Sequence, residues 1–554
     1  MSLTWKIFSG GALSPEDVLL TDAPGELERR GLPGAEVTAA PGEEIDAGAA
    51  FGFDSGVGKT AAAFTEIFAE AEETREFGFA AEWFFQLSVD GKIVFSCLEE
   101  GNGTKDGPLA HTAKIRLHKG RNLIAFFIRG GNRGLYFHFM ELPPAGMPRK
   151  WKKDLIGRLF PPELSLRVLP TVTGVTETSA VISAEMGSPA LMRLKYRPAG
   201  SEEPFAVTRN AAAGLFRSDP FQQFPLTGLR GGTEYEYMLE ASGNCRDFGF
   251  RAGPFTFRTD SDRREHSLLL IGDTHQSVRQ LDRFFRALAA DRRSGKPDRL
   301  VHLGDIRSNY DDFDVFPDEY LAVQQQYFDN AIPCVFLRGN HEYRGEESGK
   351  FADRFGPTYG FFRLGEVCYL LLDTGWDLDG TGKEFPAREN MRSFMEEQKR
   401  WLLDITASSA WKEAAYHVAL AHAPMWSTSR SIREYVRFLA GDLFLGEKPA
   451  HRLDLWLCGD VHRAARLDVG TQNIRTLRRD ERGEDAARQG YIPCPVVTLN
   501  APNPVMPENS ALRLDADASG VHVKHFFPGG ETIDDFIIRP GGKVETVNST
   551  LSVF

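Results

Sequence analysis

The sequence predicts a multidomain protein in which two N-terminal all-β sandwiches precede an α/β layered domain, a β-sandwich flanked by helices. Three observations predict this order. Residues 1–145 are short β-rich segments broken by Gly, Asn and Asp, and residues 164–260 alternate apolar and β-branched residues between frequent turn signals. From residue 261 onward, strand-like and helical segments alternate. A length of 554 residues suits several domains of roughly 150 residues each.

The first region, residues 1–145, carries its clearest strands at 81–97, on either side of Asp90-Gly91, a dipeptide that favours a tight hairpin turn. A second strand-rich stretch follows at 113–139. Its phrase LHKGRNLI, together with the earlier DGK, resembles the jelly-roll sandwiches of galactose-binding-like domains. The resemblance implies a module that contacts carbohydrate, and the alternative is a packing or lid domain with its aromatic residues in the core. The aromatic residues considered for a sugar platform are Trp5, Trp83 and Tyr136.

A basic, Pro-containing stretch at 146–163 reads as a surface linker to the second region, residues 164–260. This second region predicts a small antiparallel sandwich. Its phrase LTGLRGGTEYEYML resembles the closing strands of fibronectin type III-like domains. We expect this domain to support its neighbour without carrying chemistry itself.

The third region, residues 261–554, predicts buried strands that each end in a polar motif. Helical spacing is evident at 276–293, 319–331 and 395–408, between those strands. Because sites in α/β sheets form at the carboxyl ends of the strands, the polar motifs are expected to meet there.

Composition excludes several classes of protein. Asp plus Glu (77) exceed Lys plus Arg (65), and the net charge of -12 argues against general nucleic-acid binding. No window approaches the length of an uncharged membrane span, and the start lacks a secretory signal, so the chain as written reads as soluble and cytoplasmic. It would be exported if Met1-Ser2-Leu3 replaces a removed signal. Five cysteines lie in or beside apolar runs, which predicts that their thiols are buried: Cys97, Cys334, Cys368, Cys458 and Cys494. Buried free thiols favour a reducing compartment.

Five motifs in the third region carry the candidate chemistry: GDTHQ at 272–276, HLGD at 302–305, RGNHE at 338–342, AHAP at 421–424 and CGDVH at 458–462. Their carboxylates, imidazoles and amide can all bind a divalent metal ion. The residues concerned are Asp273, His275, Asp305, Asn340, His341, His422, Asp460 and His462.

The whole set, in this order, resembles the calcineurin-like metallophosphoesterase superfamily over residues 265–525, and the domain order resembles that of purple acid phosphatases. The resemblance implies two divalent metal ions, drawn from Mn, Zn and Fe, with Asp305 bridging them. The first ion would be held by Asp273, His275, Asp305 and His462, and the second by Asp305, Asn340, His422 and Asp460.

A water molecule between the ions would lose a proton and attack phosphorus in line. His341 would face the phosphate as a catalytic residue that stabilises the transition state or protonates the departing oxygen. Glu342 or another carboxylate would then set its tautomer.

Two positions depart from the family pattern. Asp460 stands where most members have His, and we expect it to bind the second metal and to favour Mn or Fe as a hard oxygen donor. Ser308 stands where purple acid phosphatases have the Tyr that binds ferric iron, so a purple centre is not expected.

Neighbouring residues have weaker predictions. Arg307, Arg338 and Tyr310 flank ligand positions and are predicted to contact the substrate phosphate. Asp373 is predicted to support the site, and Trp376 and Trp426 either line the cleft or pack in the core. His302 and His417 lie within strands and are predicted to be core histidines.

The leading hypothesis is a metal-dependent phosphomonoesterase. The alternative enzyme is a phosphodiesterase acting on nucleotides, lipid head groups or polymers, because substrate choice lies in the loops 376–390, 425–447 and 471–492. A third hypothesis, from another class, is a glycan-binding protein with a weakly active or inactive phosphoesterase domain.

Overall fold

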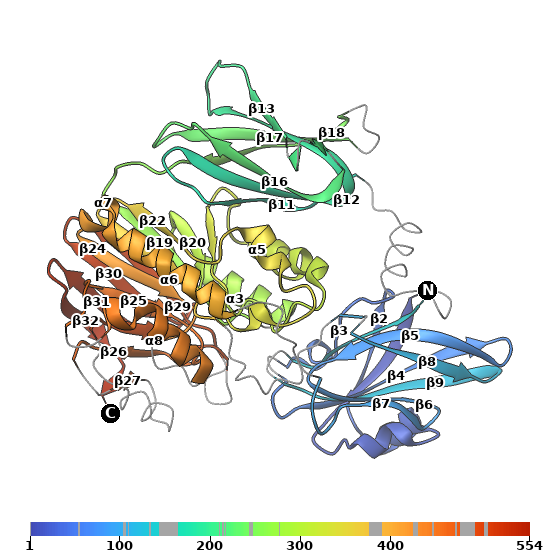
Figure 1. The fold of residues 1–554 in the computed structure, drawn as a ribbon. Coiled ribbons are helices and arrows are strands. Elements are labelled where there is room, and N and C mark those ends of the chain that lie inside the picture. Colours follow the sequence, from blue (N-terminus) through green and yellow to red (C-terminus); the bar gives the residue numbers. More distant parts are fainter. Residues whose placement is uncertain are drawn as a thin grey trace.

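The computed structural model describes residues 2–553 except 54–55, 103–106, 109, 132–133, 143–163, 210, 213–214, 217, 243–247, 276, 376–390, 425–429, 446–447, 471–473, 477–492 and 503–507. The predicted linker at 146–163 lies outside the described residues. Figure 1 shows an N-terminal β-sandwich, a second group of strands and a C-terminal α/β part, in that chain order. The predicted fold class is confirmed.

The N-terminal part consists of two antiparallel sheets. The larger has the order β2 (Gly34–Ala39), β1 (Leu3–Ser9), β4 (Thr60–Ala69), β9 (Gly120–Arg129), β6 (Phe84–Val89) and β7 (Lys92–Ser96). The smaller has the order β3 (Ile45–Asp46), β10 (Tyr136–Glu141), β5 (Glu73–Ala81) and β8 (His111–Leu117). The short helices in this part are η1 (Pro15–Leu19), α1 (Ala23–Arg29) and η2 (Ala49–Phe51). The predicted turn joins β6 to β7, with positive φ at both Asp90 (47°) and Gly91 (75°), as a two-residue hairpin requires.

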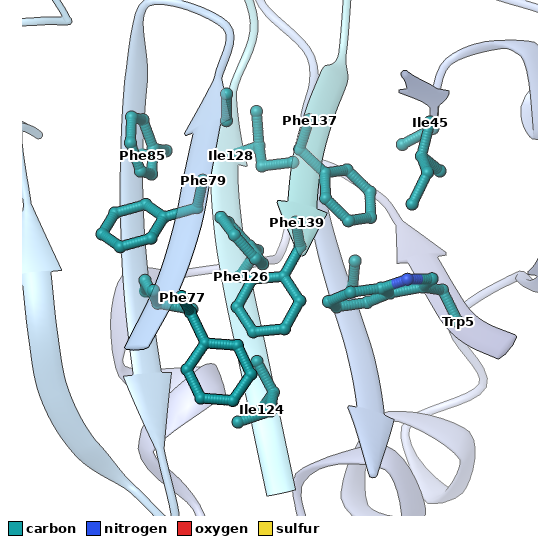
Figure 2. Close-up of a cluster of buried hydrophobic side chains, with 14 of the residues drawn as sticks. Trp5, Ile45, Phe77, Phe79, Phe85, Ile124, Phe126, Ile128, Phe137 and Phe139 are labelled. Carbon is teal, nitrogen blue, oxygen red and sulfur yellow. The ribbon is translucent and has the colours of Figure 1, made fainter. Parts of the chain in front are cut away.

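The space between these two sheets is filled by aromatic rings, which Figure 2 shows interleaved from both sides. Trp5 is buried, with its ring edge-on to Phe126, Phe137 and Phe139. Tyr136 is buried as well, whereas Trp83 is 37% exposed. The burial of Trp5 and Tyr136 agrees with the alternative in which these aromatic residues belong to the core.

The middle part is antiparallel throughout. Its main sheet has the order β11 (Leu166–Thr173), β12 (Ser179–Pro198), β17 (Glu234–Ser242) and β18 (Phe250–Arg258), with β13 (Ala206–Arg209) and β16 (Asp219–Thr227) also paired to β12. The small ribbon beside it is β14 (Ala211–Ala212) and β15 (Leu215–Phe216).

The C-terminal part stacks two mixed sheets face to face. The first has the order β21 (Cys334–Phe336), β20 (Arg299–His302), β19 (His266–Ile271), β29 (Ala511–Asp517), β30 (Gly520–Phe526), β31 (Thr532–Arg539) and β32 (Lys543–Ser549). The second has the order β22 (Gly360–Leu364), β23 (Val367–Leu372), β24 (Tyr416–Ala421), β25 (Leu455–Cys458), β28 (Val496–Thr498), β26 (Ala465–Leu467), β27 (Ile474–Thr476) and β33 (Ser552–Val553). Buried aliphatic side chains from both sheets form the core between them. This is the β-sandwich that the sequence predicts.

Helices cover the two outer faces of this sandwich (Figure 1). On the first sheet lie α3 (Val278–Ala290), η3 (Phe313–Val315), the π-helical turn η4 (Pro317–Leu321), α4 (Ala322–Gln325) and α5 (Lys350–Phe355). On the second sheet lie α6 (Met391–Ala407), α7 (Ser409–Lys412) and α8 (Arg430–Phe444). The predicted helices at 276–293 and 395–408 are confirmed as α3 and α6. The one predicted at 319–331 is shorter, because it becomes a π-helical turn and one turn of α-helix. Among the described helices, none has the length and apolarity needed to cross a bilayer.

The middle part is fixed to the C-terminal part by a buried ion pair, an exposed ion pair and an apolar contact. Glu185 of β12 accepts hydrogen bonds from Arg354 of α5 and from Arg167, the latter at 3.0 Å. Arg167 also reaches Asp318 at 3.0 Å and 3.1 Å. Val168 enters the hydrophobic core beneath α3. Helix α5, which follows the RGNHE motif, is thereby held in place by Glu185 of the middle part.

Two predicted core histidines and five predicted thiols are confirmed as buried. His302 is fully buried, stacks on Phe336 and hydrogen-bonds to the Tyr320 hydroxyl at 2.9 Å. His417 is bonded to the Trp411 carbonyl at 2.9 Å. The five cysteines are all free thiols in the interior.

Candidate metal centre

The five motifs meet at one edge of the β-sandwich. Parallel strands β19, β20 and β21 lead into the turns that carry Asp273, Asp305 and Asn340. Parallel strands β24 and β25 of the facing sheet lead into the turns that carry His422 and Asp460. The two sheets are joined here, since the His422 ring contacts the Leu303 carbonyl through Nδ1 at 2.9 Å. The carboxyl ends of both sheets therefore face the same small volume.

Two clusters of potential ligand atoms share Asp305. One comprises His275, Asp305 and His341, the other Asp273, Asp305 and His422, and within each the atoms lie within 4.8 Å of one another. Asp305 is 2% exposed, Asp273 and His422 are fully buried, and His275 is 8% exposed. One carboxylate between two donor clusters is the arrangement that a bridged pair of cations needs.

The remaining predicted ligands lie beside these clusters. His462 Nε2 is 3.3 Å from Asp273 Oδ1, and Asn340 Oδ1 is 2.9 Å from His422 Nε2. The backbone N–H of Asp460 donates to Asp273 Oδ1 at 3.1 Å. All eight candidate residues are thus brought together, His341 included.

Two buried polar atoms test whether this donor set fits a metal. Among the described residues, Asp273 Oδ2 and His275 Nδ1 are buried without a hydrogen-bond partner. Such atoms cost free energy unless something satisfies them, and a cation does so for a carboxylate oxygen and an imidazole nitrogen alike. The residues therefore fit divalent metal ions.

The backbone at the motifs adopts a conformation that few residues accept. Of the described non-glycine residues, five have positive φ: Asp90 in the hairpin, and Asp273 (51°), Asp305 (51°), Asp460 (67°) and His462 (52°). The left-handed region is costly for most side chains and clusters at functional sites. Asp460 shares this conformation with three predicted ligands.

Glycines beside the ligands leave room for the side chains of the site. A Cβ added to Gly459 would lie 2.1 Å from Asp273 Oδ2, and one added to Gly339 would lie 2.3 Å from Asp305 Oδ1. The glycines of the CGDVH and RGNHE motifs are therefore required by the carboxylates of other motifs.

Charges within the centre perturb each other strongly. Burial opposes ionisation of Asp305, yet His341 and His422 hold the pKa of this carboxyl well below its usual value. Burial likewise opposes the charged form of His422, yet Asp305 raises the pKa of that imidazole well above its usual value. Burial and then His462 lower the pKa of His275 to about 4. The buried carboxylates thus attract positive charge, which metal ions supply in place of protons.

Glu342 has a different role from the one predicted. Its carboxylate accepts hydrogen bonds from the backbone N–H groups of Asp305 and Ile306, both at 2.8 Å, and of Gly339 at 2.7 Å. The tautomer prediction is wrong, because His341 Nδ1 lies 2.7 Å from the Ser308 carbonyl and not beside Glu342. Glu342 instead ties together the turns that carry two motifs.

The three predicted substrate contacts are side chains engaged with carboxylates. Arg338 Nε donates to Asp373 at 2.9 Å, and their side chains are 3% and 0% exposed. Arg307 pairs with Glu319, and its side chain is 8% exposed. The fully buried Tyr310 hydroxyl donates to Glu342 at 2.9 Å.

The sequence predicts that Asp373 supports the site from behind its metal ligands. Its carboxylate accepts hydrogen bonds from Arg338 and from the Tyr343 hydroxyl, the latter at 2.7 Å. It supports the turn around the RGNHE motif through these two side chains. Trp376 and Trp426 lie outside the described residues, as do 376–390 and most of 471–492.

Arg344 was missed by the sequence analysis. Its Nη1 lies 2.9 Å from His341 Nε2 and 3.1 Å from Nδ1. The signal was a basic residue three positions after His341, one turn of helix away, which brings two side chains together.

The chain is similar to one protein family and to several solved structures. Residues 266–464 match the family model described as calcineurin-like phosphoesterase. No curated protein matches by sequence. Similar solved structures include PhoD, at 12% identity and a TM-score of 0.44, covering 70% of this chain and 94% of that one. A dimetal phosphatase from Danio rerio has 12% identity and a TM-score of 0.32, covering 48% and 98%. GAP50, the anchor in the inner membrane complex of Plasmodium, has 12% identity and a TM-score of 0.35, covering 50% and 90%.

The family model spans all five motifs, from the start of β19 to residue 464. The α/β part of this chain is accordingly a calcineurin-like metallophosphoesterase domain, a hydrolase of phosphoric esters with a centre for two divalent metal ions.

Proposed function

We propose that this chain hydrolyses phosphomonoesters at a centre in which Asp305 bridges two metal ions. The observation that carries the proposal is the membership of Asp305 in both donor clusters. We assign Asp273, His275 and His462 to the first ion. We assign Asn340, His422 and Asp460 to the second.

The chain's own residues would divide the remaining work. When bound, two such cations lower the pKa of a water molecule and neutralise charge on the phosphoryl oxygens. Asp305 orients both metal positions from a buried turn, where electrostatic interactions are stronger than in water. His341 Nδ1 faces the Ser308 carbonyl, so His341 would act at the departing oxygen through Nε2, an atom that also lies 2.9 Å from Arg344 Nη1.

Asp460 would give the second metal site a hard oxygen donor where most members of the family have an imidazole nitrogen. Burial opposes the charged forms of His422 and His462, Asp305 and Asp273 respectively are the main causes of their raised pKa values, and the charge of Asp460 adds to both. Its left-handed backbone matches that of the other aspartates in the centre. An anionic oxygen donor in place of an imidazole favours Mn or Fe over softer metals.

The preference for monoesters is supported by the accessible edge of the centre. The side chains of His341 and His462 are 15% and 24% exposed, whereas that of Asp305 is 3% exposed, so a substrate would approach over the imidazoles. The guanidinium of Arg344 adds a positive charge beside His341. A monoester dianion gains more from such charge than a diester monoanion does.

The test compares kcat/KM for an aryl phosphate with that for a bis-aryl phosphate, after reconstitution with Mn²⁺, Zn²⁺ or Fe²⁺. Faster monoester hydrolysis, lost in Asp305→Asn and kept in the exposed control Asp353→Asn on α5, is the expected result. Activity confined to the diester would overturn the monoester preference and leave the phosphodiesterase alternative. Absence of both metal uptake and hydrolysis would overturn the whole proposal and favour the glycan-binding alternative.

A further inference from the structure

Helix α5 lies against the strands of the middle part (Figure 1), and side chains from those strands complete it. With six residues, α5 is too short to be stable alone. The carbonyl of Arg354, one of the last four in the helix, has no partner within it and accepts the Gln223 amide of β16 at 2.7 Å. The Arg354 side chain, 10% exposed, pairs with Glu185 and lies 4.2 Å from the centre of the Phe221 ring. The middle part therefore fixes both the backbone and the side chain of Arg354.

Helix α5 in turn packs against Tyr310, in the loop that follows the bridging Asp305. Phe351 of α5 is fully buried, and its ring centroid is 6.0 Å from that of Tyr310. Phe313 stacks on Tyr310 at 5.3 Å, and the guanidinium carbon of Arg354 is 5.3 Å from the Phe313 ring. Tyr310 is fully buried among these groups, so its position depends on that of α5.

The hydroxyl of Tyr310 connects α5 to the bridging ligand through Glu342. It donates to the buried Glu342 carboxylate at 2.9 Å. The same carboxylate accepts the backbone N–H groups of Asp305 and Ile306, both at 2.8 Å. Asp305 has a φ of 51°, a conformation that costs free energy and persists only where its surroundings impose it. Glu342 helps to impose this conformation, and Tyr310 orients Glu342.

The backbone of Tyr310 is also packed against the segment that follows the RGNHE motif. Gly345 has a φ of 100°, and a Cβ there would lie 2.3 Å from the Tyr310 carbonyl carbon and 2.4 Å from the Asp311 nitrogen. Even a methyl group does not fit between the two backbones. A shift of Tyr310 in this direction would therefore shift the turn that carries Asn340 as well.

We propose that the middle part positions the metal centre: through α5 and Tyr310 it holds Glu342, and hence the backbone of the bridging Asp305. This inference rests on the bridging role of Asp305 in the proposed function. Functional metal–ligand distances hold to within roughly 0.2 Å, and a shared ligand that moves is felt at both ions. Arg354 and Tyr310 are then positioning residues, and Tyr310 acts on Glu342 instead of on the substrate phosphate.

The experiment titrates the metal-free full-length chain with Mn²⁺ and compares Arg354→Met, Tyr310→Phe and the double variant with wild type. Arg354→Met keeps a long apolar side chain and leaves Glu185 paired with Arg167, so the variant should fold. Tyr310→Phe keeps the ring and removes only the hydroxyl. Loss of a group that orients ligands weakens metal binding by about 10- to 100-fold, so each single variant should bind Mn²⁺ about 10-fold more weakly. Because the first residue acts through the second, the double variant should also lose about 10-fold, well short of the roughly 100-fold expected of independent sites.

Two further variants separate positioning from general destabilisation. Leu194→Ala, at a fully buried position in the core of the middle part, should lower the thermal unfolding midpoint and leave the Mn²⁺ affinity unchanged. Gln223→Ala removes only the hydrogen bond to α5 and should weaken Mn²⁺ binding by up to about 5-fold, a test that holds even if Arg354→Met does not fold.

Wild-type Mn²⁺ affinity in both Arg354→Met and Gln223→Ala would overturn the positioning role of the middle part. Single-variant losses that multiply in the double variant would overturn the route through Tyr310. A loss in Leu194→Ala as large as that in Arg354→Met would reduce the effect to stability and overturn the inference. Wild-type protein that binds fewer than two Mn²⁺ ions per chain would instead overturn the proposed function, so the two failures are distinguishable.

Discussion

Substitution of Gly459 by Ala gives a direct test of the metal centre. The added Cβ would stand 2.1 Å from Asp273 Oδ2, about 1.3 Å inside the 3.4 Å at which ordinary contact begins. The backbone at Gly459 is not among the positive-φ positions, so alanine brings no strain of its own. The whole effect should therefore fall on the carboxylate of Asp273.

The magnitude follows from the tolerance of metal ligands. Functional metal–ligand distances hold to within roughly 0.2 Å, and the carboxylate must move several times that far. Disturbing residues that merely orient ligands weakens metal binding by about 10- to 100-fold, so displacing a ligand should cost at least about 100-fold, or about 2.8 kcal/mol.

Elemental analysis and Mn²⁺ titration of purified Gly459→Ala are the assays. Metal content should fall from two ions per chain to one or fewer, with hydrolysis lost and the thermal unfolding midpoint of the metal-free protein little changed. Gly441→Ala on α8 is the matched control, since a Cβ there meets nothing within 4 Å and alanine should stabilise the helix by about 1 kcal/mol. Two ions held by Gly459→Ala with wild-type affinity would refute the geometric reasoning.

Three further outcomes are expected. Asp460→Ala should retain one metal ion per chain and Asp460→His should retain two, as measured by elemental analysis; unchanged content in the alanine variant would contradict ligation by Asp460. Burial lowers the pKa of His302 to about 3, so its neutral form is required in the fold, and stability should fall as pH drops from about 6.5 toward 4, by up to about 3 kcal/mol for this residue. Urea unfolding of His302→Gln at pH 7 and pH 4.5 should show a smaller loss than wild type, and an equal loss would exclude His302 as the cause. Glu185→Gln should destabilise the protein by about 3 kcal/mol, because it leaves Arg354 facing a neutral group in the interior; the exposed pair Glu203 and Arg230 supplies the control Glu203→Gln, expected to change stability by less than about 1 kcal/mol.

Much of the C-terminal fold was predictable because its signals are local. Apolar runs ending in Gly-Asp or Gly-Asn identified the parallel strands, and the rule that sites form at their carboxyl ends brought the motifs to one edge. The closing strands were not assigned individually, because β29 pairs with β19 across more than 240 residues of chain and no local pattern specifies that partner. Metal ligation by the individual residues stays a prediction.

The surroundings of the centre were less predictable than its ligands. Arg338 opens the RGNHE motif and Tyr310 follows the HLGD motif, but their directions depend on Asp373 and Glu342, carboxylates supplied by other turns. Arg344 could have been found only by treating His341 as the start of a helical turn. Sequence proximity indicates which residues are near a centre, whereas packing decides which of them face it.

The left-handed backbone at four of the motif residues restricts how this centre can evolve. Asp, Asn and His occupy that conformation several times more often than other side chains do. A saturation library at positions 273, 305, 460 and 462 should therefore yield folded variants chiefly with those three residues or Gly, all but Gly being metal donors. The backbone conformation therefore limits the substitutions that position 460 accepts during evolution to a few residue types. Asp and His are two of them, so one can replace the other and change the preferred metal while the loop keeps its conformation.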